Sequence, residues 1–521
     1  MKNIFAAAIA IPLQLFATQS EAQMADPNIV DPADQEATYE TYAPSGSYDE
    51  DLEVGSAKIM IYELFEDRDH SRHMSLVAHI ARLSSEDMSR RLGLSTRPEI
   101  ITQTVGTEGF DDILGQADVI NYSAGLQANM LASITSGSVV DYDMNSAIFV
   151  QAVGNHGQSG GALDRGHFDG DVSDIIQFYP YSIQVGEVVE FPNGMTIRDG
   201  HSARAGPTLV SRNWTDGRTS FQYMDLDTFN GLDEEVKKEY RVDDQGFFSR
   251  IDGTSFTSPD ASGALGAAKE AYPQLSNSEH IAALVASAEL SESMLQTGQF
   301  AFNGDTLPYD PINLGYGVFS PDLYATNLQE MLEINQGGPE LQDQAEAVTE
   351  FTQEQVTHNG DPYFQHTFEV DENLTGFKAT FSMQLPLRTI PADHFIVISP
   401  SGQERFIPAS IGAGESRFTT EAFLGEQTKG TWQVLTPGES RAAMPTDEGY
   451  EALTWAYDPD TQTETNVAAT LTLYGQEMGP DGTSTISRFI DKIQETRDLK
   501  PVNAGSDADR DVEISPLQQD R

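Results

Sequence analysis

The chain has 521 residues, enough for two or three domains that each bury a core. Its 81 acidic residues outnumber 30 basic ones and give a formal net charge of −51, which argues against nucleic acids and anionic membranes as partners. It contains no cysteine, so disulfides are excluded and stability must come from packing or bound ions.

The first 22 residues have the features of a signal peptide. Lys2 gives a positive start, residues 4–17 are mostly apolar, and a Ser-Glu-Ala stretch ends at Ala22. The apolar run is too short to span a bilayer, and no later run reaches spanning length. We therefore expect an exported protein, secreted or periplasmic, without a membrane span. Residues 23–52 are acidic and rich in Pro, Ser and Tyr, which predicts disorder.

Apolar runs that alternate with helical patterns predict a parallel sheet. The runs cover residues 58–62, 117–122 and 147–153, and helices are expected over 74–83 and 126–140. Strands that are apolar on both faces are typical of a doubly wound α/β sheet covered on both sides. In such sheets the functional site lies outside the carboxyl ends of the strands.

Polar and small residues follow each of these predicted strands. Glu63 follows the first, Ser123, Ala124 and Gly125 end the second, and Asn155 follows the third. Because parallel strands end at one edge of a sheet, we expect these residues to converge there.

Ser255 lies in a Gly-Thr-Ser turn before a segment of small residues, 261–268. We expect a closely packed helix that starts at Pro259, because proline suits the first turn of a helix. Ser255 would then sit at the positive, N-terminal end of this helix, which favours an attacking oxygen. The alternative is a buried small-residue helix with a serine cap.

The polar residues together fit nucleophilic catalysis. A serine nucleophile needs a base, and His70 is expected at the start of a helix. The second nitrogen of that histidine needs a partner, for which Glu63 is the nearest carboxylate at a strand end. Asn155 can supply a side-chain N–H to an oxyanion. His70 and His73 are also candidate metal ligands, but no metalloprotease-type His-Glu spacing accompanies them.

Several motifs resemble those of subtilisin-type (subtilase) serine peptidases. Residues 253–259, Gly-Thr-Ser-Phe-Thr-Ser-Pro, match the nucleophile motif of that family, and residues 70–74, His-Ser-Arg-His-Met, resemble its His-Gly-Thr-His-Val. Residues 152–155, Ala-Val-Gly-Asn, resemble its oxyanion stretch, and residues 118–125 resemble its substrate-binding strand. The resemblance covers residues 55–325 in the order of the family. It implies a subtilisin-like fold, with Ser255 as nucleophile, His70 as base, Asn155 as oxyanion donor, and Ser123, Ala124, Gly125 and Gly154 as substrate-binding residues.

The chain departs from the family pattern at two positions. Glu63 stands where the family has the aspartate of its catalytic triad, and its side chain is one methylene longer. Asp67 and Asp69 are the other candidates, although Asp69 is adjacent to His70 and neighbouring side chains diverge at a helix start. Ser71 replaces the glycine that follows the catalytic histidine.

The C-terminal part changes to short strands with frequent turn signals, which predicts an all-β sandwich or jelly roll. Three of its motifs resemble the P domain of kexin-type proprotein convertases. They are Ser-Pro-Ser-Gly at 399–402, Gly-Thr-Trp at 430–432 and Leu-Tyr-Gly at 473–475. The expected organisation is a signal peptide at 1–22, a disordered segment at 23–52, a subtilisin-like domain at 53–325, a linker at 326–350, a P-domain-like β-module at 351–476 and an acidic tail at 477–521 with one short helix over 487–497.

The sequence therefore predicts an exported serine endopeptidase that acts on protein or peptide substrates. The alternative is a catalytically degenerate subtilase scaffold that binds partners or mediates adhesion through its β-module. The chemistry requires no cofactor. Structural calcium is expected from the family and from acidic loops that suit its preference for oxygen ligands, but no ligands are identified.

Overall fold

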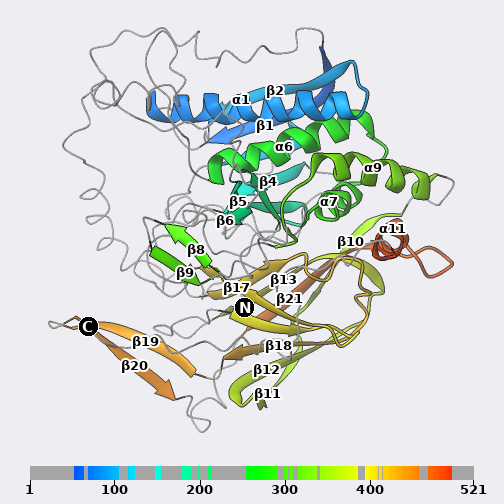
Figure 1. The fold of residues 1–521 in the computed structure, drawn as a ribbon. Helices are drawn as coiled ribbons and strands as arrows, with labels where there is room; N and C mark the ends of the chain where they lie inside the picture. The colour runs from blue at the N-terminus through cyan, green and yellow to red at the C-terminus, as the bar shows by residue number, and fades with distance from the viewer. Residues whose placement is uncertain are drawn as a thin grey trace, which may run out of the picture. The chain divides into compact units, whose positions relative to one another are not determined.

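The computed structural model describes residues 52–63, 68–104, 115–123, 147–153, 179–190, 196–198, 209–212, 254–289, 299–302, 305–308, 315–336, 341–384, 394–408, 410–412, 415–437, 439–446, 449–456 and 468–495 (Figure 1). All of them belong to one compact unit, Ser45–Arg521. The predicted signal peptide, the predicted helix over 126–140 and nearly all of the predicted disordered segment lie outside the described residues.

A seven-stranded sheet forms the N-terminal part of the structure, in the order β2-β1-β3-β4-β5-β6, with β7 also pairing with β5 (Figure 1). Every pairing in it is parallel except that of β5 with β6. The parallel sheet predicted from the sequence is therefore confirmed. The strands are β1 (Glu53–Glu63), β2 (Thr96–Thr104), β3 (Val119–Tyr122), β4 (Ile148–Ala152), β5 (Ser182–Glu190), β6 (Thr196–Arg198) and β7 (Leu209–Arg212).

The strands form because their apolar runs are buried on both faces. Ile59, Met60 and Ile61 follow one another in β1 and all three are fully buried, as are Ile148 and Phe149 in β4. A strand of a half-exposed sheet would instead alternate between apolar and polar side chains.

Five helices are described, and two of them, α1 and α6, lie side by side against the sheet (Figure 1). The helix predicted over residues 74–83 is confirmed and is longer than predicted. The helices are α1 (Arg68–Arg91), α6 (Thr254–Ala271), α7 (Asn277–Val285), α9 (Pro321–Asn335) and α11 (Thr485–Gln494).

Helix α6 begins at Thr254, so the predicted start at Pro259 is wrong and this proline lies inside the helix. An interior proline removes the hydrogen bond to the carbonyl four residues earlier, which here is that of Ser255. The helix starts earlier because Thr254, Ser255 and Thr257 are already buried against the rest of the fold. Ser255 therefore occupies the first turn itself.

Small residues let α1 and α6 approach closely. A Cβ atom built on Gly263 would collide with the backbone oxygen of Ala81 and lie 2.7 Å from the Cβ of Ser84. Replacing the glycine with any other residue forces one of the two helices to move.

The substitution Gly263→Ala is expected to destabilise the protein. The overpacking cost of about 1–3 kcal/mol exceeds the stability of roughly 1 kcal/mol that alanine gains over glycine within a helix. The measurement is the free energy of unfolding in urea, with Gly115→Ala as the control, because no atom lies within 4 Å of a Cβ at that position. Equal unfolding midpoints for the two variants would contradict the close helix contact.

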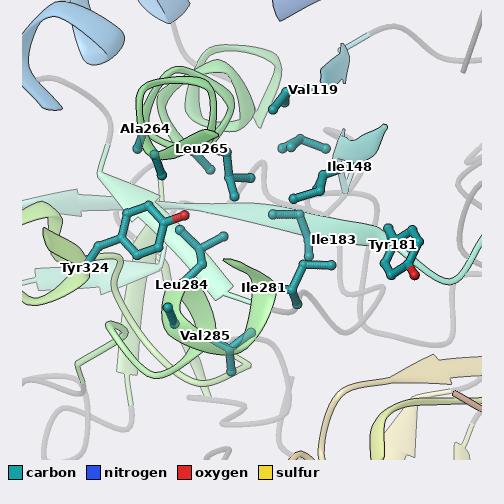
Figure 2. Packing of buried hydrophobic residues seen from close by; sticks show 14 of the residues in the cluster. Val119, Ile148, Tyr181, Ile183, Ala264, Leu265, Ile281, Leu284, Val285 and Tyr324 are labelled. Atoms are coloured by element: carbon teal, nitrogen blue, oxygen red, sulfur yellow. The ribbon is translucent and has the colours of Figure 1, made fainter. Parts of the chain in front are cut away.

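The core joins side chains from the sheet and from all five described helices. Figure 2 shows Val119, Ile148 and Ile183 of the sheet gathered with side chains of α6, α7 and α9. The labelled helix residues are Ala264, Leu265, Ile281, Leu284, Val285 and Tyr324, all nearly inaccessible to solvent (Figure 2).

The C-terminal part contains two five-stranded antiparallel sheets, in the orders β10-β21-β13-β17-β16 and β11-β12-β18-β14-β15. Two separate hairpins, β8-β9 and β19-β20, complete the described strands. The strands are β8 (Gln299–Phe302), β9 (Asp305–Pro308), β10 (Asp343–Val348), β11 (Phe351–His358), β12 (Asp361–Val370), β13 (Leu374–Gln384), β14 (His394–Ile398), β15 (Glu404–Pro408), β16 (Ser410–Gly412), β17 (Glu415–Thr420), β18 (Gly430–Pro437), β19 (Glu439–Thr446), β20 (Gly449–Ala456) and β21 (Ala469–Glu477).

An aromatic core lies between the two five-stranded sheets. Phe381 of β13 contacts Phe368 of β12 and Phe395 of β14, with ring centroids 6.1 and 5.3 Å apart. Trp432 of β18 belongs to the same buried cluster. The antiparallel, all-β character predicted for this part is confirmed.

Residues 326–350, predicted as a linker from their Gln- and Glu-rich composition, contain most of α9 and all of β10. Tyr324, Leu328 and Met331 follow one another at helical spacing and are buried in the core. Helix α11, predicted over 487–497 within an otherwise acidic tail, likewise buries Phe489 and Ile493 in the core. Both segments are ordered by apolar side chains that composition alone does not reveal.

The β-module and the parallel sheet share a buried boundary. Tyr181 stacks on Phe377 with centroids 5.8 Å apart, and its hydroxyl donates to Asp343 Oδ2 over 2.9 Å. Ser278 Oγ donates to Asp343 Oδ1 over 2.6 Å. Burial raises the pKa of the Asp343 carboxyl to about 6, although hydrogen bonds from Ser278 and Tyr181 lower it.

No helix among the residues described is long and apolar enough to cross a membrane.

Candidate active site

The carboxyl ends of the parallel strands bring the candidate residues to one edge of the sheet. The pairing of β1 with β3 ends at Tyr62 and Tyr122, and the residues that follow them in the chain are Glu63 and Ser123. Helix α1 begins five residues after Glu63, so His70 lies in its first turn. The two chain segments therefore leave the sheet at the same edge.

Ser255 meets the end of β3 directly. It lies in the first turn of α6, is buried to 7% exposure, and its Oγ donates a hydrogen bond to the backbone oxygen of Ser123 over 2.7 Å. The structure thus brings together the predicted nucleophile and the first predicted substrate-binding residue, which are 132 positions apart in the sequence.

The first turn of α6 gives Ser255 a favourable electrostatic setting. The N–H groups of a first helical turn have no partner within the helix and create a positive potential there. No acidic residue lies in this turn to offset that potential. A developing negative charge on a substrate oxygen next to Ser255 would therefore be stabilised.

Three further side chains form a buried polar cluster with Ser123. Asn121 Nδ2 donates to Ser123 Oγ over 2.8 Å, and Asn121 Oδ1 accepts from Ser258 Oγ at 3.1 Å and from Ser262 Oγ at 2.9 Å. Ser123 Oγ and Ser258 Oγ are 2.8 Å apart. The sequence analysis missed Asn121, Ser258 and Ser262. An asparagine within an apolar strand and two serines four residues apart in a small-residue helix were the available signals.

Asp260 was also missed by the sequence analysis. Its carboxylate accepts a hydrogen bond from Ser211 Oγ over 2.6 Å, and its backbone oxygen accepts one from Ser84 Oγ over 2.7 Å. These bonds tie α6 to β7 on one side and to α1 on the other.

The other predicted site residues are described only in part or not at all. Glu63 is the last residue of β1 and His70 the third of α1, but their side chains lie outside the described part of the chain. The predicted substrate-binding residues Ala124, Gly125 and Gly154, the oxyanion candidate Asn155 and the alternative carboxylate Asp67 also lie outside it.

His79, which lies further along α1, is a packed histidine. It is buried, and burial together with the nearby charge of Arg82 lowers its pKa to about 4. It is therefore neutral at physiological pH.

Within the described ranges, no group of three or more His, Cys, Asp or Glu side chains is arranged to hold a metal ion. The structural calcium expected from the sequence stays a prediction.

A profile of the subtilase family matches residues 56–317. A search of curated proteins finds no match to this chain. The matched range contains β1, α1, β3, β4 and α6, and all the candidate catalytic residues lie within it by position in the sequence.

Several solved structures align with the chain at low identity. A serine protease of Aeromonas sobria aligns at 15% identity and a TM-score of 0.49, over 81% of this chain and 88% of that chain. The A-subunit of an AB5 toxin from E. coli aligns at 13% identity and a TM-score of 0.31, over 53% and 93%. Fervidolysin from Fervidobacterium pennivorans, described as a keratinolytic enzyme related to subtilisin, aligns at 13% identity and a TM-score of 0.28, over 69% and 66%.

Proposed function

This chain belongs to the subtilase family, and from that premise we propose that it is an exported serine endopeptidase that hydrolyses peptide bonds in protein substrates. The observation that supports this proposal most is the place of Ser255. It lies in the first turn of a buried helix, and its hydroxyl donates a hydrogen bond to the backbone oxygen of Ser123 at the end of β3.

In the proposed mechanism, Ser255 Oγ attacks the carbonyl carbon of the scissile bond. His70 takes the hydroxyl proton and later delivers it to the leaving amine, and Glu63 holds the imidazole in the required orientation. The oxyanion receives hydrogen bonds from the backbone N–H of Ser255 and from Asn155. The N–H of Ser255 suits this role, because it lies in a helical turn whose N–H groups have no partner in the helix.

The identity of the triad carboxylate gives a testable prediction. In subtilisin the loss of the triad aspartate costs about 10⁴ in kcat, and we expect a similar fall for Glu63→Ala. Asp67→Ala is the matched variant, because it removes the other candidate carboxylate from the same short connection. Steady-state hydrolysis of a peptide substrate by both variants makes the comparison. Loss of activity in Asp67→Ala alone would move the triad role to Asp67.

The test of the proposed function is hydrolysis of a library of unstructured peptides by the full chain, followed by mass spectrometry of the products. We expect cleavage of internal peptide bonds that a serine-directed inhibitor prevents. If no peptide is cleaved, the endopeptidase proposal fails and the degenerate scaffold that binds partners through its β-module takes its place.

The remaining parts of the proposal concern the rest of the chain. The signal-like first 22 residues support export. A P-domain-like jelly roll at the C-terminus is supported by the two packed antiparallel sheets and by the fully buried Trp432, whose Nε1 donates to Thr428 O over 2.7 Å. Structural calcium is proposed from the charge of −51 and from the family alone.

A further inference from the structure

The polar cluster below Ser255 forms a closed ring of hydrogen bonds. Asn121 Nδ2 can only donate, and it donates to Ser123 Oγ. Asn121 Oδ1 can only accept, and it receives the single hydroxyl proton of Ser258. With that proton on Asn121 Oδ1, the 2.8 Å contact between the two serine hydroxyls is a donation from Ser123 Oγ to Ser258 Oγ. Each member of the ring therefore gives one proton and receives one.

The ring is buried and fully paired. Asn121 and Ser258 are completely inaccessible to solvent, and Ser123 is 5% exposed. Hydrogen bonds in such a setting polarise one another, and removing a member leaves its neighbours without partners at a cost of about 1–3 kcal/mol for each buried group. Ser262 supports the ring from outside, with one hydroxyl proton directed at Asn121 Oδ1 or at Ser258 O.

The ring connects a strand and a helix whose relative position must be kept for catalysis. Asn121 and Ser123 belong to the end of β3, whereas Ser258 lies one helical turn after Ser255 on α6. The side chain of Ser123 is fully engaged in the ring, while its backbone oxygen receives the Ser255 hydroxyl. The carbonyl that holds the nucleophile is thus fixed by the ring.

We propose that Asn121 and Ser258 are positioning residues for the nucleophile: through the ring with Ser123 they lock the end of β3 onto α6 and set the direction of the Ser255 Oγ. This inference rests on the proposed function. It also assigns the Ser123 side chain to the ring, so that only the backbone of Ser123 remains available to a substrate.

The test measures how fast Ser255 reacts, separately from how well a peptide binds. The probe is a small dialkyl fluorophosphonate, which reports the reactivity of the serine without needing to occupy an extended substrate strand. A misplacement of about 1 Å in a catalytic group can cost about 10²-fold in rate. We expect Asn121→Ala and Ser258→Ala each to lower the second-order rate constant of phosphonylation and kcat by about 10–100-fold.

Ser84→Ala is the matched control, because it removes a buried hydrogen bond of similar length between α1 and α6. Ser84 Oγ donates to Asp260 O over 2.7 Å and does not contact the ring. We expect its loss of stability in urea to be similar to that of the ring variants and its phosphonylation rate to stay within twofold of wild type. The double variant Asn121→Ala/Ser258→Ala should lose no more reactivity than the poorer single variant, since one substitution already opens the ring.

The outcomes separate this inference from the proposed function. If the wild type does not react with the fluorophosphonate, the peptidase proposal itself fails. If the wild type reacts and both ring variants react as fast as Ser84→Ala, the ring has only a structural role and the inference is overturned. Should Asn121→Ala fail to fold, Ser258→Ala gives the same decision alone, because it removes one hydroxyl and leaves the asparagine in place.

Discussion

Replacing Ser255 with alanine is expected to lower kcat for peptide hydrolysis about 10⁶-fold, the loss known for the nucleophile of subtilisin. The expectation rests on the place of Ser255 in the first turn of α6, where its hydroxyl reaches the end of β3. Alanine removes the attacking oxygen and leaves the helix intact. The measurement is kcat from steady-state hydrolysis of a peptide that the wild type cleaves.

The control for this variant is Ser287→Ala, which removes a buried serine hydroxyl from another part of the fold. Ser287 Oγ donates to Leu284 O over 2.6 Å, so its loss costs some stability but no active-site contact. We expect this variant to keep its kcat. A Ser255→Ala enzyme whose kcat stays within tenfold of wild type would show that Ser255 is not the nucleophile.

Lys378→Met is expected to lower the free energy of unfolding by about 3–5 kcal/mol, the cost of removing one partner of a buried ion pair. Lys378 lies on β13 and is buried, and its ammonium donates to the backbone oxygen of Ser182 over 2.6 Å. It also lies 3.6 Å from the Glu421 carboxylate, which is 7% exposed. Methionine would leave that buried carboxylate without its cation. It would also remove the hydrogen bond between Lys378 in the β-module and Ser182 in strand β5.

Lys492→Met is the matched control for this substitution. Lys492 lies 3.6 Å from Glu330, the same separation as in the buried pair, but the side chains are 44% and 29% exposed. Exposed pairs contribute about 0–1 kcal/mol, so this variant should unfold almost as the wild type does. A loss of similar size in the two variants would show that burial of Lys378 does not matter.

The stability supplied by Lys378 should also depend on pH in a defined window. Burial lowers its pKa from 10.5 to about 8, and the charge of Glu421 limits the fall. Between these two values the unfolded chain holds a proton that the folded chain has released, so the stability of the folded state rises with pH. Relative to Lys378→Met, the wild type should therefore gain stability as the pH rises through this window. Urea unfolding at several pH values tests this, and a constant difference between the two proteins would contradict it.

The sequence predicted the elements of the parallel sheet because their signals are local. Three apolar runs of strand length became β1, β3 and β4, and the small residues after Ser255 became the buried helix α6. The place of Ser255 beside Ser123 agrees with the resemblance of both motifs to those of one family, because Ser255 lies at a helix start, where the strand-end rule does not apply. The start of α6 was misplaced by five residues, because tertiary burial of Thr254 and Ser255 outweighed the preference of proline for the first turn.

The polar interior could not be predicted, because it depends on which side chains face one another across the fold. Asn121 and Ser258 are 137 positions apart, and neither position is distinctive without the pairing of β3 with α6. Lys378 stands in an alternating strand, where a lysine usually faces solvent, yet it is buried against Ser182, 196 positions away. In residues 326–350 the difficulty was the opposite one, because polar composition obscured the apolar stripe of α9.

The most direct test of the central claim is covalent labelling of the full chain with a fluorophosphonate, followed by mass spectrometric mapping of the modified peptide. We expect a single adduct on Ser255 in the wild type and none in Ser255→Ala. Absence of an adduct in the wild type, or equal labelling of the two proteins, would contradict the assignment of Ser255 as the nucleophile of a serine peptidase.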